Sequence, residues 1–392
     1  MAEAGFKQVP VIRVTMNDEP VGRLAMADDR RCVFEYDDHW LIAGFSISPF
    51  YLPLKPGLFT ARYDPFNGLF GVFSDSLPDG WGTLLIDRWL LKQGVQPATL
   101  TPLDRLALVG RHGMGALSYE PDRGPEKQTD TTNLEFLARE VKKILHQDYS
   151  GSLELLIQQG GSSGGARPKV LVTVQGEEWL VKFPSSSDPQ DIGTLEYRYS
   201  QVAKKCAVMM PETRLFEDTW FGVRRFDRKE GRRIHVHSAS GLLYAGFRYP
   251  SLDYTELIKA TMALTSDMNE VARLFRLMVF NVLTGIRDDH AKNFSFLYDD
   301  GRWQLSPAYD LVRSEGFNGF HSTTVAGAGN PSKQDLFNVA EQTGFPLKKA
   351  TLIFDEVYEC CREIRRGTTA FAEASALERD EGRRTRDEGR GN

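Results

Sequence analysis

Residues 288–293 read Asp288-Asp289-His290-Ala291-Lys292-Asn293, and a second acidic motif, Ser306-Pro307-Ala308-Tyr309-Asp310, follows after a short hairpin pattern. An apolar helical stretch leads into the first motif. ATP-dependent phosphoryl transfer needs one group that aligns the nucleophile and two that hold Mg²⁺. These motifs supply such a set: an acid, an amide five residues later and a second acid beyond the hairpin. The spacing predicts a kinase with Asp288 as catalytic base and Asn293 and Asp310 as metal ligands.

The alternative interpretation is structural: the two aspartates end a helix and Asn293 caps a turn. The context favours the kinase, because strand patterns at 294–298 and 303–305 flank the turn Asp299-Asp300-Gly301, which places Asp310 where kinases carry a metal-binding Asp. Lys292 is predicted to reach the same phosphates. Asp289 either points to solvent or supports the loop.

Composition indicates an ordinary globular protein of two or three domains: 392 residues, 41% hydrophobic and 26% charged. The net charge of −5 argues against a chain that mainly coats nucleic acid. Four cysteines without C-x-x-C spacing predict reduced thiols. The N-terminus lacks a signal-peptide profile and no apolar run reaches about 18 residues, so a cytoplasmic protein without membrane insertion is expected.

Hydrophobic periodicity predicts an α+β fold. The expected parts are an N-terminal subdomain at 1–125, a region with a Gly-rich loop at 126–250, a helical lobe at 251–368 and a disordered tail at 369–392. Expected strands are 9–16, 32–36, 170–174, 178–183, 213–216 and 220–226. Expected helices are 83–92, 152–159, 194–203, 253–264, 268–283, 333–342 and 347–365, with another after a capping-box pattern at 132–135. Asp79 is expected to cap the helix at 83–92.

The run Gly160-Gly161-Ser162-Ser163-Gly164-Gly165-Ala166-Arg167-Pro168-Lys169 can bring backbone N–H groups to phosphate oxygens. It predicts ATP contacts from Gly164, Gly165, Ala166 and Lys169. The run also contains Gly-x-Ser-x-Gly, which raises a serine hydrolase as a rival. A nucleophile elbow needs strand, turn and helix, whereas here a helix pattern precedes and a strand pattern follows, which opposes the hydrolase. A plain flexible loop is the other alternative.

Lys182 ends a hydrophobic strand, where a buried ammonium group needs an anionic partner because an unpaired charge is costly to bury. We predict that it contacts ATP phosphates and pairs with Glu196 on the next helix. A lysine that reaches water is the alternative. Phe226, within Arg225-Phe226-Asp227-Arg228, is predicted to lie against adenine, and a surface charge cluster is the competing interpretation.

Two further patterns are weak. His235-x-His237 lacks a third metal ligand nearby. The region 338–353 resembles a helix-turn-helix, but Phe345-Pro346 and the acidic net charge favour two packed helices.

With these residues assembled, the chain resembles the HipA family of serine/threonine kinases, the toxins of bacterial toxin–antitoxin pairs, over roughly residues 9 to 365. The ordered motifs are Leu77-Pro78-Asp79-Gly80-Trp81, Gly110-Arg111-His112-Gly113-Met114-Gly115-Ala116-Leu117, Ser163-Gly164-Gly165-Ala166-Arg167-Pro168-Lys169, Val181-Lys182-Phe183-Pro184, Arg225-Phe226-Asp227-Arg228, Asp288-x-His290-Ala291-Lys292-Asn293-Phe294 and Pro307-Ala308-Tyr309-Asp310-Leu311. The resemblance implies an N-terminal subdomain followed by a bilobal kinase-like domain with a mainly helical C-terminal lobe.

The resemblance also implies functional assignments. These are Asp288 as base, Asn293 and Asp310 as Mg²⁺ ligands, Lys182 on ATP, and inhibitory autophosphorylation at Ser162 or Ser163. It implies a helix-turn-helix antitoxin partner, with DNA bound only through that partner, and a protein substrate such as an aminoacyl-tRNA synthetase.

The chain departs from the family pattern at Arg224, where an acidic residue is common, and at His235-Val236-His237-Ser238. The alternatives kept are a catalytically weak binding module or co-repressor of the same fold, and a small-molecule kinase.

Overall fold

The computed structural model describes residues 7–125, 131–148, 152–160 and 164–367. The predicted disordered tail and the two candidate autophosphorylation residues, Ser162 and Ser163, lie outside the described residues. The chain divides into two compact units. The first comprises residues 1–194, 212–237 and 241–244, and the second comprises residues 195–211, 238–240 and 245–392.

The first unit begins with an antiparallel five-stranded sheet in the order β4-β3-β2-β1-β5. Its strands are β1 Val11–Met16, β2 Glu19–Met26, β3 Cys32–Tyr36, β4 Phe59–Thr60 and β5 Leu117–Glu120. Asn17 and Asp18 have positive φ (49° and 69°), which suits the tight turn between β1 and β2. Alternate residues such as Ile12 and Val14 are buried, so one sheet face forms a core with α1 Asp38–Ala43, α2 Gly71–Ser74 and α4 Pro102–Val109.

A second sheet in the same unit has the order β6-β7-β9-β8 and is also antiparallel. Its strands are β6 Lys169–Val174, β7 Glu177–Lys182, β8 Thr213–Phe216 and β9 Trp220–Arg224. Helices α3 Gly80–Lys92, α5 Leu134–Leu145 and α6 Leu153–Gly160 share a core with it. The prediction that the last strand extends to Phe226 is wrong, because the backbone turns after Arg224 into the short hairpin of β10 Arg228–Lys229 and β11 Arg232–Arg233.

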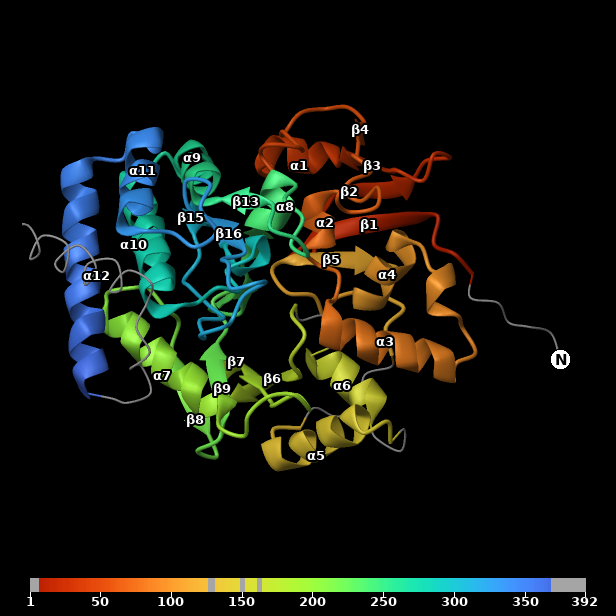
Figure 1. Cartoon of the computed structure of the whole chain (residues 1–392). Helices are drawn as coiled ribbons and strands as arrows, with labels where there is room; N and C mark the ends of the chain where they lie inside the picture. The colour runs from red at the N-terminus through yellow and green to blue at the C-terminus, as the bar shows by residue number, and fades with distance from the viewer. Residues whose placement is uncertain (1–6, 126–130, 149–151, 161–163, 368–392) are drawn as a thin grey trace, which may run out of the picture. The chain divides into compact units, whose positions relative to one another are not determined.

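Helices dominate the second unit. Figure 1 shows α9 Tyr254–Thr265, α10 Met268–Thr284, α11 Lys333–Thr343 and α12 Leu347–Gly367 gathered together. The predicted inner face of α10 is confirmed, since Val271, Leu274, Phe275, Met278 and Val282 are all buried. The hairpin of β14 Ser295–Asp299 and β15 Arg302–Leu305 turns at Asp300 and Gly301, and β13 Leu252–Asp253 pairs in parallel with β16 Thr323–Thr324.

Three elements contain the points where the chain passes from one unit to the other: α7 Ile192–Lys205, β12 His235–Ser238 and α8 Ala239–Leu243. The predicted α+β class is confirmed, because most strand pairs are antiparallel and most helices follow one another instead of alternating with strands.

Two predicted helix caps need correction. Asp79 occupies the N-cap position of α3, but its side chain makes no capping hydrogen bond. The capping box expected from Thr132 does not form, because the N-cap is Asn133, whose side chain accepts a hydrogen bond from the Phe136 N–H. A neighbouring Asn caps as well as Thr does, so composition alone could not choose between them.

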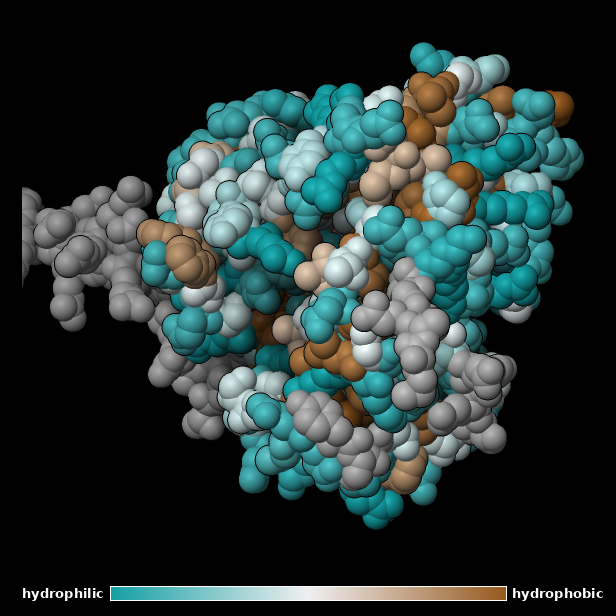
Figure 2. All heavy atoms as spheres, turned by 90° about the vertical axis from the view of Figure 1, so that its right-hand side faces the viewer, coloured by the Kyte–Doolittle hydropathy of each residue, from teal (hydrophilic) through white to brown (hydrophobic). Residues whose placement is uncertain are grey.

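The face turned to the viewer in Figure 2 is mostly hydrophilic, with hydrophobic side chains in small patches, as is usual for protein surfaces. Among the described residues, no helix has both the length and the apolar character needed to cross a membrane.

Candidate active site

The loop that carries Asp288 is fixed by its own side chains. Helix α10 ends at Gly285, whose left-handed conformation (φ 69°) turns the chain. Asp288 is exposed, and the Asn293 side-chain amide donates a hydrogen bond of 2.7 Å to the Asp288 carbonyl oxygen. The short 3₁₀ turn at 291–293 accommodates this closure. The structure therefore brings Asn293 back onto Asp288, and the amide oxygen of Asn293 remains as an acceptor.

The segment that carries Asp310 is tied to this loop on both sides. The Tyr309 hydroxyl donates to the Lys292 carbonyl oxygen at 2.7 Å and lies 2.5 Å from the Ser295 hydroxyl. Beyond Asp310, the Ser314 hydroxyl accepts hydrogen bonds from the Arg287 and Asp288 N–H groups at 3.1 and 2.7 Å. Asp310 itself has a φ of 57°, which is uncommon for a residue other than glycine. The predicted base and the two predicted metal ligands thus belong to one hydrogen-bonded assembly.

Asp289 has a larger structural role than sequence reasoning assigned to it. Its side chain is 1% exposed, so of the two interpretations left open, support of the loop is the correct one. The carboxylate accepts hydrogen bonds from Tyr254, His321 and the backbone N–H groups of Ser322 and Thr323, at distances between 2.9 and 3.2 Å. Burial, followed by the charge of Asp289, raises the pKa of Tyr254 well above its usual value. Asp289 therefore links residues 321–323 to the loop at 288–293 through hydrogen bonds.

Lys292 and His290 both approach an aromatic ring of the same unit. The Lys292 ammonium lies 4.1 Å from the centroid of the Phe247 ring, within cation–π range, and the His290 ring lies 6.1 Å from it. The predicted contact of Lys292 with phosphate stays a prediction.

The Gly-rich loop lies in the first unit, between α6 and β6, in the predicted order of helix, loop and strand. Gly165 has a φ of 88°, and its carbonyl accepts a hydrogen bond from the Trp81 N–H at 3.2 Å. A Cβ on Gly80 would lie 2.8 Å from the Ala166 Cα, so glycine permits the close approach of α3 to the loop. The ammonium of Lys169, which is 5% exposed, donates to the Gly164 carbonyl oxygen.

Two lysines face each other at the end of the hairpin beside this loop. Lys169 on β6 is the direct cross-strand partner of Lys182 on β7, and directly opposed residues share one face of a sheet. The Lys182 ammonium also lies 5.6 Å from the centroid of the Phe221 ring. The hairpin therefore carries two cationic side chains on one face at the end that adjoins the Gly-rich loop.

The remaining predicted ATP contacts are placed as follows. Glu196 lies on α7 and is 2% exposed, but it belongs to the second unit, so its pairing with Lys182 stays a prediction. Phe226 is half-buried in the turn after β9, and its contact with adenine stays a prediction.

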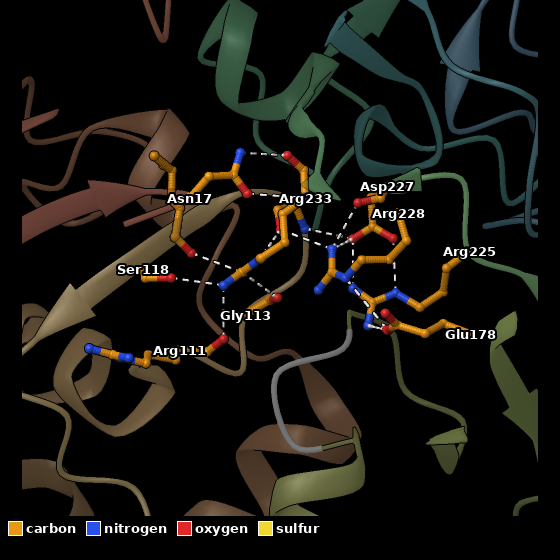
Figure 3. A network of polar contacts seen from close by, with 11 residues as sticks. Asn17, Arg111, Gly113, Ser118, Glu178, Arg225, Asp227, Arg228 and Arg233 are labelled. Carbon is orange, nitrogen blue, oxygen red and sulfur yellow. Dashed lines mark hydrogen bonds and ion pairs between the residues drawn. The ribbon is translucent and has the colours of Figure 1, made fainter. Parts of the chain in front are cut away.

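The alternative of a surface charge cluster at 225–228 is wrong, because Arg225 and Asp227 are buried. Figure 3 shows them in one network of polar contacts with Arg228. Two nitrogens of Arg225 contact the two carboxylate oxygens of Asp227 at 2.9 and 2.7 Å. Asp227 also accepts a hydrogen bond from the Gly115 N–H at 2.8 Å and one from Arg228 at 2.9 Å. Burial would raise the pKa of Asp227, but the charges of Arg225 and Arg228 together with the hydrogen bonds from Arg225 and the Gly115 N–H outweigh it and hold this pKa well below its usual value.

Arg233 is a second residue that sequence reasoning missed. Figure 3 shows its guanidinium among backbone carbonyls of the stretch 110–117. It donates hydrogen bonds of 2.8 to 3.0 Å to four carbonyls and one hydroxyl, those of Arg111, Gly113, Gly115, Leu117 and Ser118. Burial, followed by the charges of Arg228 and Arg225, lowers its pKa to about 10. The glycines of this stretch thus serve to wrap backbone carbonyls around one cation.

The two histidines of β12 take part in buried hydrogen bonds. His237 lies 3.0 Å from the Ser48 hydroxyl through Nε2 and 2.7 Å from the Asp75 carboxylate through Nδ1. This is the order of a serine hydrolase triad, but Ser48 and His237 are 2% and 0% exposed, so no substrate reaches the hydroxyl. His235 lies 2.9 Å from the Ile47 carbonyl oxygen.

The region compared with a helix-turn-helix forms α11 and α12, which pack on other helices of the second unit. Gly344, with a φ of 71°, ends α11.

Comparison with known proteins agrees with these motifs. A sequence model of the HipA-like C-terminal domain matches residues 161–364, and one of the HipA N-terminal domain matches residues 12–120. A protein of Sinorhizobium fredii named "Putative kinase Y4mE" is 35% identical over 345 residues, covering 78% of this chain and 77% of its own length. Another from that organism, "Putative kinase Y4dM", is 27% identical over 331 residues with the same two coverages.

A chain of the solved complex of HipA, HipB and operator DNA from Shewanella oneidensis MR-1 shares the fold. The TM-score is 0.69 at 18% identity, over 91% of this chain and 90% of that one. Because the C-terminal domain model alone matches more than half of the sequence, the chain belongs to the HipA family.

Proposed function

We propose that this chain is an ATP- and Mg²⁺-dependent serine/threonine protein kinase that acts as a HipA-like toxin. The observation that carries the proposal is the closed loop at 288–293, with Asp310 held against it through Tyr309 and Ser314. The names of the curated relatives point to the same class of activity.

Each residue of this loop has a chemical task in the proposed reaction. Asp288 is exposed, so its carboxylate can accept the hydrogen bond of a substrate hydroxyl and orient that oxygen. Mg²⁺ prefers oxygen ligands, and a carboxylate from Asp310 with an amide oxygen from Asn293 fits that preference, because the Asn293 nitrogen is already engaged by Asp288. When bound, the ion would neutralise charge on the phosphates.

In the first unit, the opposed Lys169 and Lys182 and the backbone at Gly164, Gly165 and Ala166 are the groups we assign to ATP phosphates. Glu196, Phe226 and Lys292 are assigned to ATP binding from their positions: Glu196 on the helix after the strand lysine, Phe226 after β9, and Lys292 in the loop of Asp288.

Regulation is proposed to follow the family as well. Autophosphorylation would fall on Ser162 or Ser163, and a helix-turn-helix antitoxin would bind the chain, with DNA contacted only through that partner. The solved relative contains HipB and operator DNA, which supports the proposed partner. A protein substrate such as an aminoacyl-tRNA synthetase is the proposed target class.

The test is phosphate transfer from labelled ATP with Mg²⁺ by the purified chain, alone and with cell lysate. Wild type should label itself or a lysate protein, and Asp288→Asn should lose at least about 100-fold, the usual scale for a positioned acid or base. Asp300→Asn is the matched control, because it removes the same charge from the exposed turn of the β14–β15 hairpin. Equal labelling by wild type and Asp288→Asn would refute the proposal.

The same solved complex also favours a second role as a co-repressor. In that case Asp288→Asn should keep antitoxin binding while wild type transfers no phosphate. Label that appears only on a metabolite would indicate a small-molecule kinase.

A further inference from the structure

Three of the four cysteines meet in the second unit. The Cys206 sulfur lies 2.6 Å from the Cys360 sulfur and 3.9 Å from the Cys361 sulfur. Cys206 follows α7, whereas Cys360 and Cys361 lie on α12, and 154 residues separate Cys206 from Cys360. The fourth, Cys32, is buried in the first unit.

The backbone around Cys206 is held so that its thiol faces α12. Its N–H donates to the Val202 carbonyl oxygen at 2.9 Å, and Ala207 takes a left-handed conformation with a φ of 56°. Arg276 of α10 donates to the Cys206 carbonyl oxygen at 3.2 Å and contacts Glu356 of α12 at 2.5 Å. An S–S bond is about 2.05 Å long, so little rearrangement separates the two sulfurs from bonding distance.

We propose that Cys206 and Cys360 form a reversible disulfide when the chain meets a low-molecular-weight disulfide. Cys360 is only partly buried and would react first, which forms a mixed disulfide and releases one small thiol. Cys206 would then attack the Cys360 sulfur, which releases the second small thiol. The two electrons and two protons of the cysteine pair thus pass to the small disulfide, which is reduced to two thiols.

The order of these steps follows from the surroundings of each sulfur. Contact with Cys361, followed by burial, raises the pKa of the Cys206 thiol far above its usual value. Cys206 is also buried, so reagents in solution reach Cys360 first, and a mixed disulfide on Cys360 then places its sulfur next to the Cys206 sulfur, where proximity compensates for the small thiolate fraction. Among the described residues, no group of three or more His, Cys, Asp or Glu is arranged to hold a metal ion, which favours a disulfide over a metal site.

The bond would restrain a segment next to the candidate active site. The Met209 carbonyl oxygen, three residues after Cys206, accepts a hydrogen bond from the Ala308 N–H at 2.8 Å, and Ala308 lies two residues before Asp310. A bond to α12 would limit the movement of residues 206–209 and, through them, of the Asp310 segment. The linkage itself does not depend on the proposed kinase activity.

The experiment uses the reduced, desalted full chain, incubated with oxidised glutathione, alkylated and digested without reductant. We expect mass spectrometry to find a peptide that joins Cys206 to Cys360, absent after dithiothreitol. Cys361→Ser is the matched control and should keep the linkage, whereas Cys206→Ser, Cys206→Ala and Cys360→Ser should lose it. The oxidised wild type should also melt several degrees above the reduced form, and Cys206→Ala should show no such shift.

Several results would overturn the inference. These are a glutathione adduct that stays on Cys360, a bond between Cys360 and Cys361, or a linkage only between two chains. Stoichiometric zinc in the purified protein that disappears in Cys206→Ser would replace the disulfide with a metal site.

Discussion

Two adjacent aspartates in one loop should respond to alanine in opposite ways. Asp288 is exposed, whereas Asp289 is buried and accepts hydrogen bonds from Tyr254, His321 and two backbone N–H groups. We expect Asp289→Ala to lose stability and Asp288→Ala to lose activity with little change in stability.

The expected loss of stability in Asp289→Ala follows from the hydrogen-bond donors that would lose their acceptor. Tyr254 keeps its contact with Asn281 at 3.0 Å, but His321 and the N–H groups of Ser322 and Thr323 lose their acceptor. Hydrogen bonds to charged groups contribute about 1.5–3 kcal/mol each, and breaking a buried polar network costs about 3–5 kcal/mol in all. Asp289→Ala should therefore cost about 4 kcal/mol, whereas Asp288→Ala should cost less than about 1 kcal/mol.

Hydrogen exchange followed by mass spectrometry can measure these losses locally, on peptides that cover 281–299 and 319–326. Asp289→Asn is the graded control, because its amide oxygen can still accept from the Ser322 and Thr323 N–H groups and its nitrogen can donate to Tyr254. It should cost about 1–2 kcal/mol. The reasoning fails if both alanine variants lose the same stability, or if Asp289→Ala leaves exchange at 319–326 unchanged.

Three further outcomes are expected. Burial, followed by the charge of His237, lowers the pKa of His235 to about 3. The folded state therefore favours the neutral imidazole, and this contribution to the free energy of unfolding is complete above about pH 6.5, the pKa of histidine in the unfolded chain. The free energy of unfolding should fall by up to about 1.4 kcal/mol per pH unit as the pH drops from there toward 3. Urea unfolding of His235→Gln should show a flatter pH dependence, and identical profiles would count against the assignment. Arg233→Lys should lose about 2–4 kcal/mol in urea unfolding, because three donors replace five, whereas the exposed Arg232→Lys should lose almost nothing. Lys182→Met should reduce ATP-dependent labelling at least about 10-fold, because the variant lacks the ammonium assigned to the ATP phosphates, and equal labelling by the variant and the wild type would contradict this assignment.

Features governed by short-range rules could be predicted from the sequence. The hairpin around Asp300 and Gly301 forms as expected because two residues with positive φ favour that turn. The inner face of α10 was also predictable, since its apolar residues repeat with helical spacing. The closure of Asn293 onto Asp288 spans five residues and agrees with the spacing from which the catalytic loop was predicted.

Features that depend on distant partners could not be predicted. Asp289 meets His321 across 32 residues, and Arg233 meets Gly113 across 120, with no local pattern that connects them. Even a motif noticed in the sequence, the glycines at 110–117, gave no hint of the cation that they surround. Hydrophobic spacing and turn chemistry report which face of an element is buried, but not which polar group it meets there.

The backbone of Asp310 lies in the left-handed region. A φ of 57° costs an L-residue with a side chain on the order of 1 kcal/mol, and glycine would adopt it freely. Tyr309 and Ser314 hold the residue there from both sides through bonds to the loop of Asp288. A strained backbone persists where its surroundings impose it, and such sites gather where function requires them. Asp18 and Asp300 adopt the same region in hairpin turns, whereas Asp310 is held there by neighbours that bond to the loop of Asp288, and this placement is what favours a role for its carboxylate.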